Sequence, residues 1–272
     1  MKVTIKDFVP EHTFDCGQCF RWEKQPDGSY IGVAGGQAVR IKAEGETVTI
    51  DGCSEKDYES FWRKYLDADR DYSEIKTAVS TNDIMKNAVS FGGGIRILRQ
   101  EFFETLISFI ISQRSSIPKI KSSVEKMCRL WGDEITFEGN AYYAFPTPEK
   151  IASLTEDDIR GIGVGYRAPY ILKAAKAVLD GEIDGERLEA LDTPSARNAL
   201  LSLYGVGDKV CDCVLLFSLA KYDLFPADVW IKRVMEESFE SKDAKALGES
   251  LFGKYSGFAQ QYLFYWRKFN NV

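Results

Sequence analysis

The sequence predicts an α+β fold in two domains. Residues 1–94 form an N-terminal domain with an antiparallel β-sheet, and residues 95–272 form a mainly helical domain. Three observations predict this organisation. Short β-prone segments alternate with turn residues over the first fifty positions. Apolar residues then follow a helical period from Ser54 onward. The triplet Gly92-Gly93-Gly94 interrupts that period and marks the predicted domain boundary.

Turn residues divide the start of the first domain into strands. The turns are Pro26-Asp27-Gly28, Gly35-Gly36 and Glu44-Gly45-Glu46. The strands expected between and beside them are residues 19–25, 29–34, 37–43 and 47–52. Ser54 as N-cap, with Asp57 three residues later, then predicts the start of a helix. Two shorter helices are expected over residues 72–80 and 82–91.

Nearly every segment beyond Gly94 has a helical pattern, and the connections are short and rich in Gly, Pro and Asp. No internal repeat or low-complexity tract is present. The expected helices are residues 100–113, 116–132, 165–181, 195–205, 208–220, 228–239 and 256–269.

The composition is that of a globular protein. The chain has 272 residues, 44% hydrophobic and 28% charged, which is enough to bury a sizeable core. The net charge of −6 argues mildly against a nucleic-acid partner, although local clustering of Lys and Arg decides binding. The first residues lack the apolar run of a secretory signal, and the most apolar window, residues 102–111, is too short to span a bilayer. We therefore expect a soluble cytoplasmic protein without a membrane partner.

The six cysteines are Cys16, Cys19, Cys53, Cys128, Cys211 and Cys213. Cys16 and Cys19 have the spacing of half a metal or redox site, but no second pair of this spacing exists, and the only histidine is His12. We expect free thiols, no metal ion and no cofactor. A redox or metal protein built on Cys16 and Cys19 is the alternative.

The segment Gly205-Val206-Gly207 lies between two expected helices. Glycines in such a hairpin let backbone N–H groups approach an anion, and the following helix N-terminus adds partial positive charge. This pattern is suited to binding a phosphate. An ordinary turn at the end of a helix is an equally consistent interpretation.

Lys209 and Asp228 each allow a structural and a chemical interpretation. Lys209 falls in the first turn of a helix, where a cation is unfavourable; this position favours a neutral amine, which can form a Schiff base. The structural interpretation is a solvated surface lysine, which is the usual environment of this residue type. Asp228 is expected to be an N-cap, and could also stabilise positive charge if it faces Lys209. The residue pattern alone does not bring the two side chains together.

The hairpin, Lys209 and Asp228 resemble the motif of the helix–hairpin–helix DNA glycosylases, L-x-G-V-G-x-K followed by Pro-x-Asp. The similarity covers nearly the whole chain and is strongest to 8-oxoguanine DNA glycosylases of the type first known from eukaryotes. The iron–sulfur branch differs, because this chain has no cysteine beyond Cys213. The matching segments, in order, are DCGQCFRW, GIRILRQEFFETLISFIISQ, GIGVGYRAPYI, KVCDCV and YSGFAQQYLF.

The resemblance implies roles for the residues at the matching positions. Lys209 would attack C1′ of the damaged nucleotide and form an imine, and Asp228 would support the cationic sugar. The carbonyl of Gly17 would accept the N7 proton that distinguishes 8-oxoguanine from guanine. Cys213 and Phe264 would sandwich the flipped base, and Gln260 would read its Watson–Crick edge. From the residues alone, the structural interpretation is favoured for each of these four, as a core, turn or surface residue.

The resemblance also implies contacts with the DNA duplex. Tyr166 would be the wedge, Arg167 would hold the orphaned cytosine, and the hairpin Gly205, Val206 and Gly207 would contact the backbone. Arg114 stands where the family has the asparagine that fills the vacated stack. Lys119 replaces a second cytosine-reading arginine. Because lysine cannot donate in a bidentate fork, we expect looser selectivity for the opposite base.

These observations predict a bifunctional 8-oxoguanine DNA glycosylase and abasic-site lyase. It is expected to act as a monomer on double-stranded DNA that contains 8-oxoguanine. Two alternatives are a glycosylase of the same fold for another damaged base, such as an alkylated purine, and a non-catalytic helix–hairpin–helix DNA-binding protein. The second alternative does not explain Lys209 or Asp228.

Overall fold

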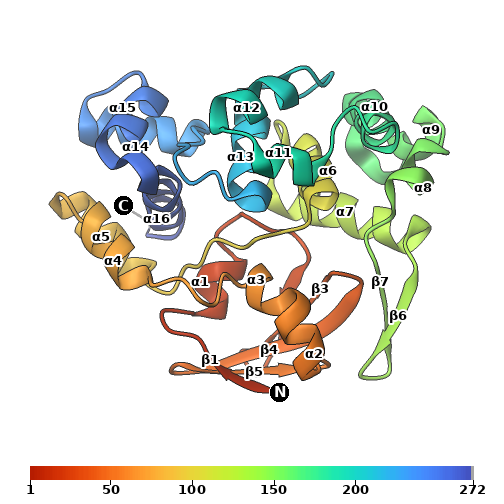
Figure 1. Ribbon diagram of the computed structural model, residues 1–272, viewed down its shortest axis with the longest axis horizontal. Coiled ribbons are helices and arrows are strands. Elements are labelled where there is room, and N and C mark those ends of the chain that lie inside the picture. Colours follow the sequence, from red (N-terminus) through yellow and green to blue (C-terminus); the bar gives the residue numbers. More distant parts are fainter. Residues whose placement is uncertain (271–272) are drawn as a thin grey trace.

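The structure is a computed structural model that describes residues 1–270. Its N-terminal part is a five-stranded antiparallel sheet in the order β1-β5-β4-β3-β2 (Figure 1). The four predicted strands are confirmed as β2 (Trp22–Lys24), β3 (Tyr30–Ala34), β4 (Gln37–Glu44) and β5 (Thr47–Asp51). The edge strand β1 (Lys2–Thr4), which pairs with β5, was not predicted.

A helical layer covers one face of this sheet. The helix that follows Ser54 runs as α2 (Glu55–Asp57), a π-helical turn η1 (Tyr58–Trp62) and α3 (Arg63–Tyr65). The predicted capping box is present, since the side chains of Ser54 and Asp57 each accept the backbone N–H of the other. Trp62 packs edge-on against Trp22, which stacks on Phe14 of α1 (Pro10–Phe14). These aromatic rings form the core of the sheet region.

The helices α4 (Tyr72–Val79) and α5 (Asp83–Phe91) belong to a different core. Their buried residues join the core of the helical part, and α5 packs along α16 (Ser256–Phe269), as Figure 1 shows. In contrast, Leu98 lies in the core of the sheet region. The predicted boundary at Gly94 therefore does not separate the two cores, because residues 72–91 pack with the second domain.

The second part is mainly helical, as predicted, and all seven expected helices are present with ends that shift by a few residues. At its centre lie α6 and α13, whose residues are almost all buried. Within residues 1–270 no helix is long and apolar enough to cross a bilayer. The elements are α6 (Phe102–Ser112), α7 (Ile117–Trp131), α8 (Pro148–Ala152), α9 (Glu156–Ile159), η2 (Arg160–Val164), η3 (Gly165–Arg167), α10 (Ala168–Leu179), α11 (Gly185–Ala190), α12 (Thr193–Leu201), α13 (Asp208–Leu219), α14 (Val229–Phe239), α15 (Ala244–Phe252), η4 (Gly253–Tyr255) and α16.

A β-hairpin interrupts the helical part, and the sequence analysis did not predict it. The strands β6 (Glu134–Phe137) and β7 (Asn140–Tyr143) pair through a two-residue turn. Glu138 and Gly139 both have positive φ, the conformation of the turns that match the twist of a hairpin. The tip contacts the sheet, since Nε of Arg40 in β4 donates to Glu138 at 2.9 Å. The hairpin therefore links the two parts of the molecule.

Candidate active site

The predicted hairpin connects α12 to α13 and has the expected backbone at its first glycine. Gly205 has φ +86°, and a Cβ there would overlap the ring of Tyr170. Its carbonyl accepts a hydrogen bond from Nε2 of Gln113 at 3.0 Å, which fixes the hairpin to the end of α6. Gly207 is different. It is the N-cap of α13 with φ −103°, and a Cβ added there would have nothing within 4 Å. Of the two hairpin glycines, only Gly205 therefore has a backbone conformation that favours glycine.

Lys209 and Asp228 meet in one cleft. Lys209 lies in the first turn of α13 and is half-buried, and its Nζ donates to Oγ of Ser112 at 3.1 Å. Asp228 is the N-cap of α14, where its carboxylate accepts the N–H of Ile231 at 2.9 Å. Both side chains line a cleft of about 1200 Å³ and a small cavity that opens from it. The segment that separates them in sequence therefore folds back to bring amine and carboxylate together.

Burial perturbs the carboxyl group of Asp228. Loss of solvation raises its pKa, and the N–H of Ile231 and the positive charge of Lys209 act in the opposite direction. The net direction is upward. The acid therefore keeps its proton to a higher pH than a solvated aspartate does.

The small cavity collects the four residues that the resemblance assigns to base recognition. Gly17 comes from the loop after α1, Cys213 from α13 one turn beyond Lys209, and Gln260 and Phe264 from one face of α16. Gly17 has φ +83°, and a Cβ there would lie 3.1 Å from Cε1 of Phe264. The cavity has a volume of about 50 Å³, and one water in the liquid occupies about 30 Å³. The cavity is therefore too small for a purine and must widen to admit one.

Gln260 is the polar group of this cavity. It is 5% exposed, and its Oε1 has no hydrogen-bond partner within residues 1–270. A buried acceptor without a donor is costly, and a ligand with an N–H group would satisfy it. The next residue, Gln261, has a different role: its Nε2 donates to the carbonyl of Cys16 at 2.7 Å. That bond fastens α16 to the loop that carries Gly17.

The cysteines of the site are neutral. Burial raises the pKa of Cys213 to about 11, against the lowering effect of Lys209, so Cys213 packs in the cavity as a thiol. Cys16 and Cys19 are also buried, and burial raises the pKa of Cys16 to about 11 and that of Cys19 well above its usual range. All six cysteines are free. Within residues 1–270, no group of three or more His, Cys, Asp or Glu side chains could hold a metal ion.

The residues predicted to contact the duplex occupy different environments. Tyr166 is 51% exposed, as a wedge requires, and Arg114 and Lys119 are also exposed. Arg114 lines the cleft and has φ +48°, which is rare for a residue with a side chain. Arg167 is only 6% exposed. Its guanidinium donates to the carbonyls of Val164, at 3.0 Å, and Gln113, and so supports the backbone beside Tyr166 rather than extending into solvent.

Among the cleft residues that sequence reasoning missed, three lie against Lys209 or Phe264. Phe109 and Ser112 lie in the apolar run of α6, and their i, i+3 spacing places them on the face toward Lys209. Lys268 follows Phe264 by one turn of α16 and is half-buried in the cleft, where burial lowers its pKa. The spacing of Gln260, Phe264 and Lys268 along one helix face was the available signal.

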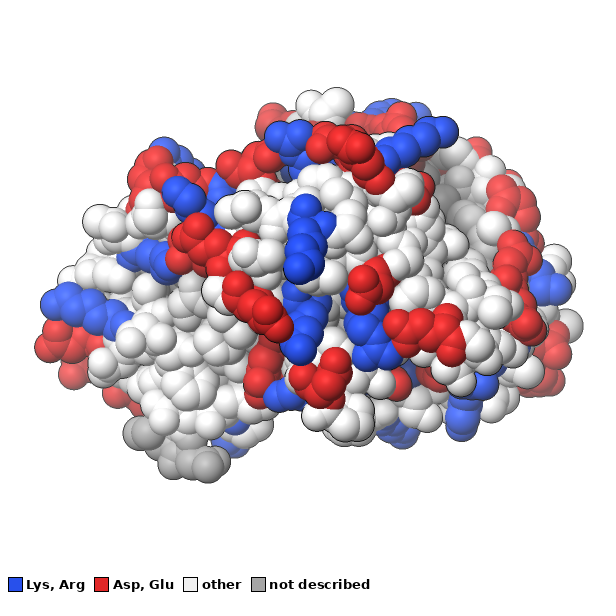
Figure 2. All heavy atoms as spheres, turned by 90° about the horizontal axis from the view of Figure 1, so that it is seen from below, with Lys and Arg blue, Asp and Glu red and all other residues white. Residues whose placement is uncertain are grey.

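The cleft is less acidic than the chain as a whole. On the face shown in Figure 2, basic and acidic side chains are interspersed. Five basic and four acidic side chains line the cleft, so the net charge of −6 does not extend into it. They are Arg114, Lys121, Lys209, Lys232 and Lys268, and Glu11, Asp15, Asp208 and Asp228.

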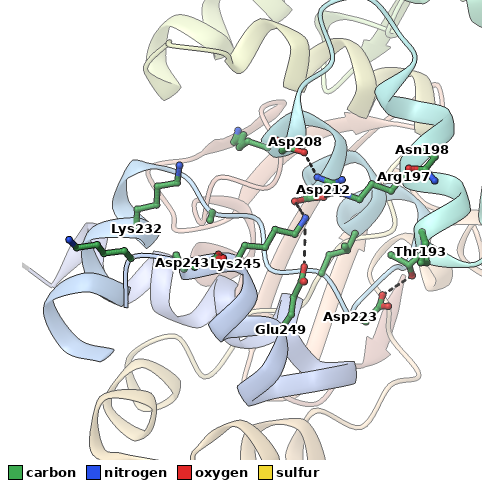
Figure 3. Close-up of a pocket in the computed structure, with 16 residues that line it drawn as sticks. Thr193, Arg197, Asn198, Asp208, Asp212, Asp223, Lys232, Asp243, Lys245 and Glu249 are labelled. Carbon is green, nitrogen blue, oxygen red and sulfur yellow. Dashed lines mark hydrogen bonds and ion pairs between the residues drawn. The ribbon is translucent and has the colours of Figure 1, made fainter. Parts of the chain in front are cut away.

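A network of ion pairs holds the helix that carries Lys209 and Cys213. Asp212 of α13 is almost fully buried and binds Arg197 of α12, at 2.9 Å, and Lys245 of α15 (Figure 3). Lys245 also lies 3.7 Å from Glu249. These residues line a second hollow, of about 950 Å³, that shares Asp208, Lys209, Ala227 and Lys232 with the cleft. The ion pairs therefore fix α12, α13 and α15 relative to one another around a hollow that Lys209 also lines.

Comparison with known proteins defines the class. Residues 107–251 match the family described as HhH-GPD superfamily base excision DNA repair protein, so the chain belongs to that superfamily. Residues 1–106 match the family described as 8-oxoguanine DNA glycosylase, N-terminal domain. The chain therefore combines this domain with the HhH-GPD domain. The chain is accordingly a member of the 8-oxoguanine DNA glycosylase family, a family of bifunctional N-glycosylase/DNA lyases.

Individual relatives agree with this assignment. The structure of MBOgg1 in complex with a low-affinity DNA ligand is 42% identical, with a TM-score of 0.97, over 100% of this chain and 96% of that one. The Clostridium acetobutylicum 8-oxoguanine glycosylase/lyase, bound to DNA with cytosine opposite 8-oxoguanine, is 40% identical, with a TM-score of 0.95, over 98% and 94%. A probable N-glycosylase/DNA lyase of Methanothermobacter thermautotrophicus is 35% identical over 63% of this chain. That match spans 62% of the relative's length.

Proposed function

We propose that this protein releases 8-oxoguanine from double-stranded DNA and then cleaves the abasic strand through an imine on Lys209. One observation carries the proposal: the amine of Lys209 and the carboxyl of Asp228 line the same small cavity as Gly17, Cys213 and Gln260. A nucleotide placed in that cavity would have its sugar beside the amine and its base among the recognition residues. Related proteins that act on 8-oxoguanine or bind DNA share the fold over nearly the whole chain.

The first step is base release. Nζ of Lys209 bonds to C1′ as the bond from C1′ to N9 breaks, and the base departs with the bonding electron pair and takes up a proton. Positive charge develops on the sugar, and the carboxylate of Asp228, held as an N-cap beside Lys209, stabilises it. Asp228 must be ionised for this role.

The second step is strand cleavage. The amine adduct opens the sugar ring to an imine, loss of the proton on C2′ follows, and the 3′ phosphate leaves by β-elimination. Water then releases Lys209. No metal or redox group takes part in this sequence, because the imine itself withdraws the electrons.

Recognition of the base follows from the cavity walls. The unpaired Oε1 of Gln260 accepts an N–H of the Watson–Crick edge, and the carbonyl of Gly17 accepts the proton on N7. The neutral thiol of Cys213 and the ring of Phe264 contact the two faces of the base. The cavity must widen to admit a purine, and extrusion of the base costs a few kcal/mol of stacking. Tyr166 would occupy the gap left in the duplex.

Borohydride trapping tests the nucleophile. Wild-type protein incubated with a duplex containing 8-oxoguanine should give a covalent adduct when borohydride is added, and Lys209→Gln should give none. Lys232→Gln, which changes another lysine of the cleft, is the matched control and should still give the adduct. An adduct that persists in Lys209→Gln and disappears in Lys268→Gln would assign the nucleophile to α16.

A duplex with an abasic site separates recognition from imine chemistry. Gln260→Met should lose adduct formation on the 8-oxoguanine duplex and retain it on the abasic duplex, since no base has to be recognised there. Equal loss on both duplexes would contradict the assigned role of Gln260. The monomeric state and cytoplasmic location expected from the sequence stay predictions.

A further inference from the structure

Lys209 makes a contact that the proposed reaction does not itself require. Its Nζ donates a hydrogen bond to Oγ of Ser112, the last residue of α6, at 3.1 Å. The same hydroxyl donates to the carbonyl of Phe109 at 2.8 Å. Ser112 is 8% exposed, so its hydroxyl is largely shielded from solvent. The amine is therefore held against the end of α6.

The direction of these bonds decides what Ser112 can do. A serine hydroxyl has one hydrogen to donate and two lone pairs that accept. Because the hydrogen goes to Phe109, Ser112 meets Lys209 only as an acceptor. The ring of Phe109, with its centroid 4.8 Å from Nζ, offers a second electron-rich surface. Both groups attract the N–H bonds of Lys209, and neither competes for the nitrogen lone pair.

We propose that Ser112 is a positioning residue for the nucleophile. Its hydroxyl turns an N–H of Lys209 toward α6, which leaves the lone pair of the neutral amine directed at the cavity shared with Asp228 and Cys213. The inference rests on the proposed function, because it assigns a role only if Lys209 attacks C1′. It adds a residue that neither the motif nor the resemblance singled out.

Removal of the hydroxyl changes how the amine is directed. Without the bond to Ser112, the lone pair of the neutral amine is directed less well at the cavity. The charged and titratable side chains that line the cleft and cavities with Lys209 are the same in wild type and variant. They are Glu11, Asp15, Cys16 and Cys19 in the N-terminal region, Arg114 after α6, Lys121 on α7, Arg197 on α12, Asp208, Asp212 and Cys213 on α13, Asp223, Asp228 and Lys232 between α13 and α14 or on α14, Lys242, Asp243, Lys245 and Glu249 before or on α15, and Tyr265 and Lys268 on α16.

The test is the pH dependence of base release under single-turnover conditions on an 8-oxoguanine duplex. For Ser112→Ala, the rate at the high-pH plateau should fall about fivefold, which is the effect of losing one hydrogen bond between neutral groups. A plateau within about twofold of wild type would overturn the proposal.

Matched variants separate positioning from packing. Ser108→Ala removes another buried hydroxyl of α6, 4% exposed and without a bond to Lys209, and should keep the wild-type profile. Ser112→Thr retains a hydroxyl and should restore the wild-type plateau rate. Ser112→Gly removes the same acceptor and replaces Ser112→Ala if the alanine variant does not fold. A plateau rate that falls as much in Ser108→Ala as in Ser112→Ala would assign the effect to packing of α6.

Trapping on an abasic duplex distinguishes the two possible failures. Wild-type protein that gives no adduct with borohydride would reject the lysine chemistry, and with it the role of Ser112. Wild-type protein that gives the adduct, together with an unchanged Ser112→Ala profile, would reject the role of Ser112 alone.

Discussion

Replacement of Gly17 by alanine tests the base cavity, and its two costs can be worked from the structure. With φ +83°, the residue is in the left-handed region, where a side chain costs about 1–2 kcal/mol. The added Cβ would also lie 3.1 Å from Cε1 of Phe264 and 3.5 Å from Cδ1 of Ile117. The first distance is shorter than an optimal carbon contact of about 3.5–4.0 Å. The ring of Phe264 must therefore move by a few tenths of an ångström.

Gly28 provides the matched control. Its φ is +81°, but nothing lies within 4 Å of a Cβ built there, so Gly28→Ala has the backbone cost without the steric contact. Gly28→Ala should lose about 1–2 kcal/mol of unfolding free energy, and Gly17→Ala should lose at least as much, because it has the steric contact in addition. Only Gly17→Ala should also slow release of 8-oxoguanine, by about tenfold or more, because the displaced ring changes the wall that contacts the base.

Two measurements decide the outcome. Urea unfolding gives the free energies, and single-turnover excision from an 8-oxoguanine duplex gives the rates. Excision at the wild-type rate by Gly17→Ala, at the expected loss of stability, would refute the placement of the base beside Gly17. Equal slowing by Gly28→Ala would instead attribute the effect to general destabilisation.

Three other changes have defined outcomes. Asp228→Asn should slow base release about 100-fold with DNA affinity within about twofold of wild type, measured by single-turnover rates and titration. Because burial raises the pKa of Asp228, wild-type activity should decline on the acid side at a higher pH than for a solvated aspartate, and this decline should be absent from the asparagine variant. The rate at which wild-type protein excises 8-oxoguanine should differ little between duplexes with C, A, G or T opposite it. Lys119→Arg should increase the preference for cytosine. A strict requirement for cytosine in wild-type protein would contradict the argument from Lys119. Burial raises the pKa of Glu104 to about 7 from an ordinary 4.5, so the native state holds more protons than the unfolded state between these two pH values. The free energy of unfolding should therefore fall as the pH rises through this window. Urea titrations at several pH values should show this slope for wild-type protein and not for Glu104→Gln.

The sequence predicted local structure well where the signal was local. The strands bounded by turn residues and the capping box at Ser54 required only neighbouring residues, and both are present. The hairpin at Glu138 was also a local signal, with alternating residues around a Glu-Gly turn, and it was missed because the surrounding region was treated as helical. That error was one of interpretation.

The candidate site needed information that no local pattern contains. Gly17 lies in the loop after α1 and Phe264 lies in α16, and only the packed fold places a Cβ at Gly17 against the ring of Phe264. The resemblance nevertheless selected both. It also selected Arg167, which is buried and donates to the carbonyl of Gln113 from another segment. The contact of Ser112 with Lys209 joins residues 97 positions apart, and so could not be read from spacing.

The bond from Gln261 to the carbonyl of Cys16 joins positions 245 residues apart. Chains fold from the N-terminus as they are synthesised, and the sheet and the glycine hairpin can form before α16 exists. The wall made by Gln260 and Phe264 is therefore completed only after α16 has been synthesised. A nascent polypeptide that ends before α16 can form the sheet and the glycine hairpin, but it lacks this wall of the cavity.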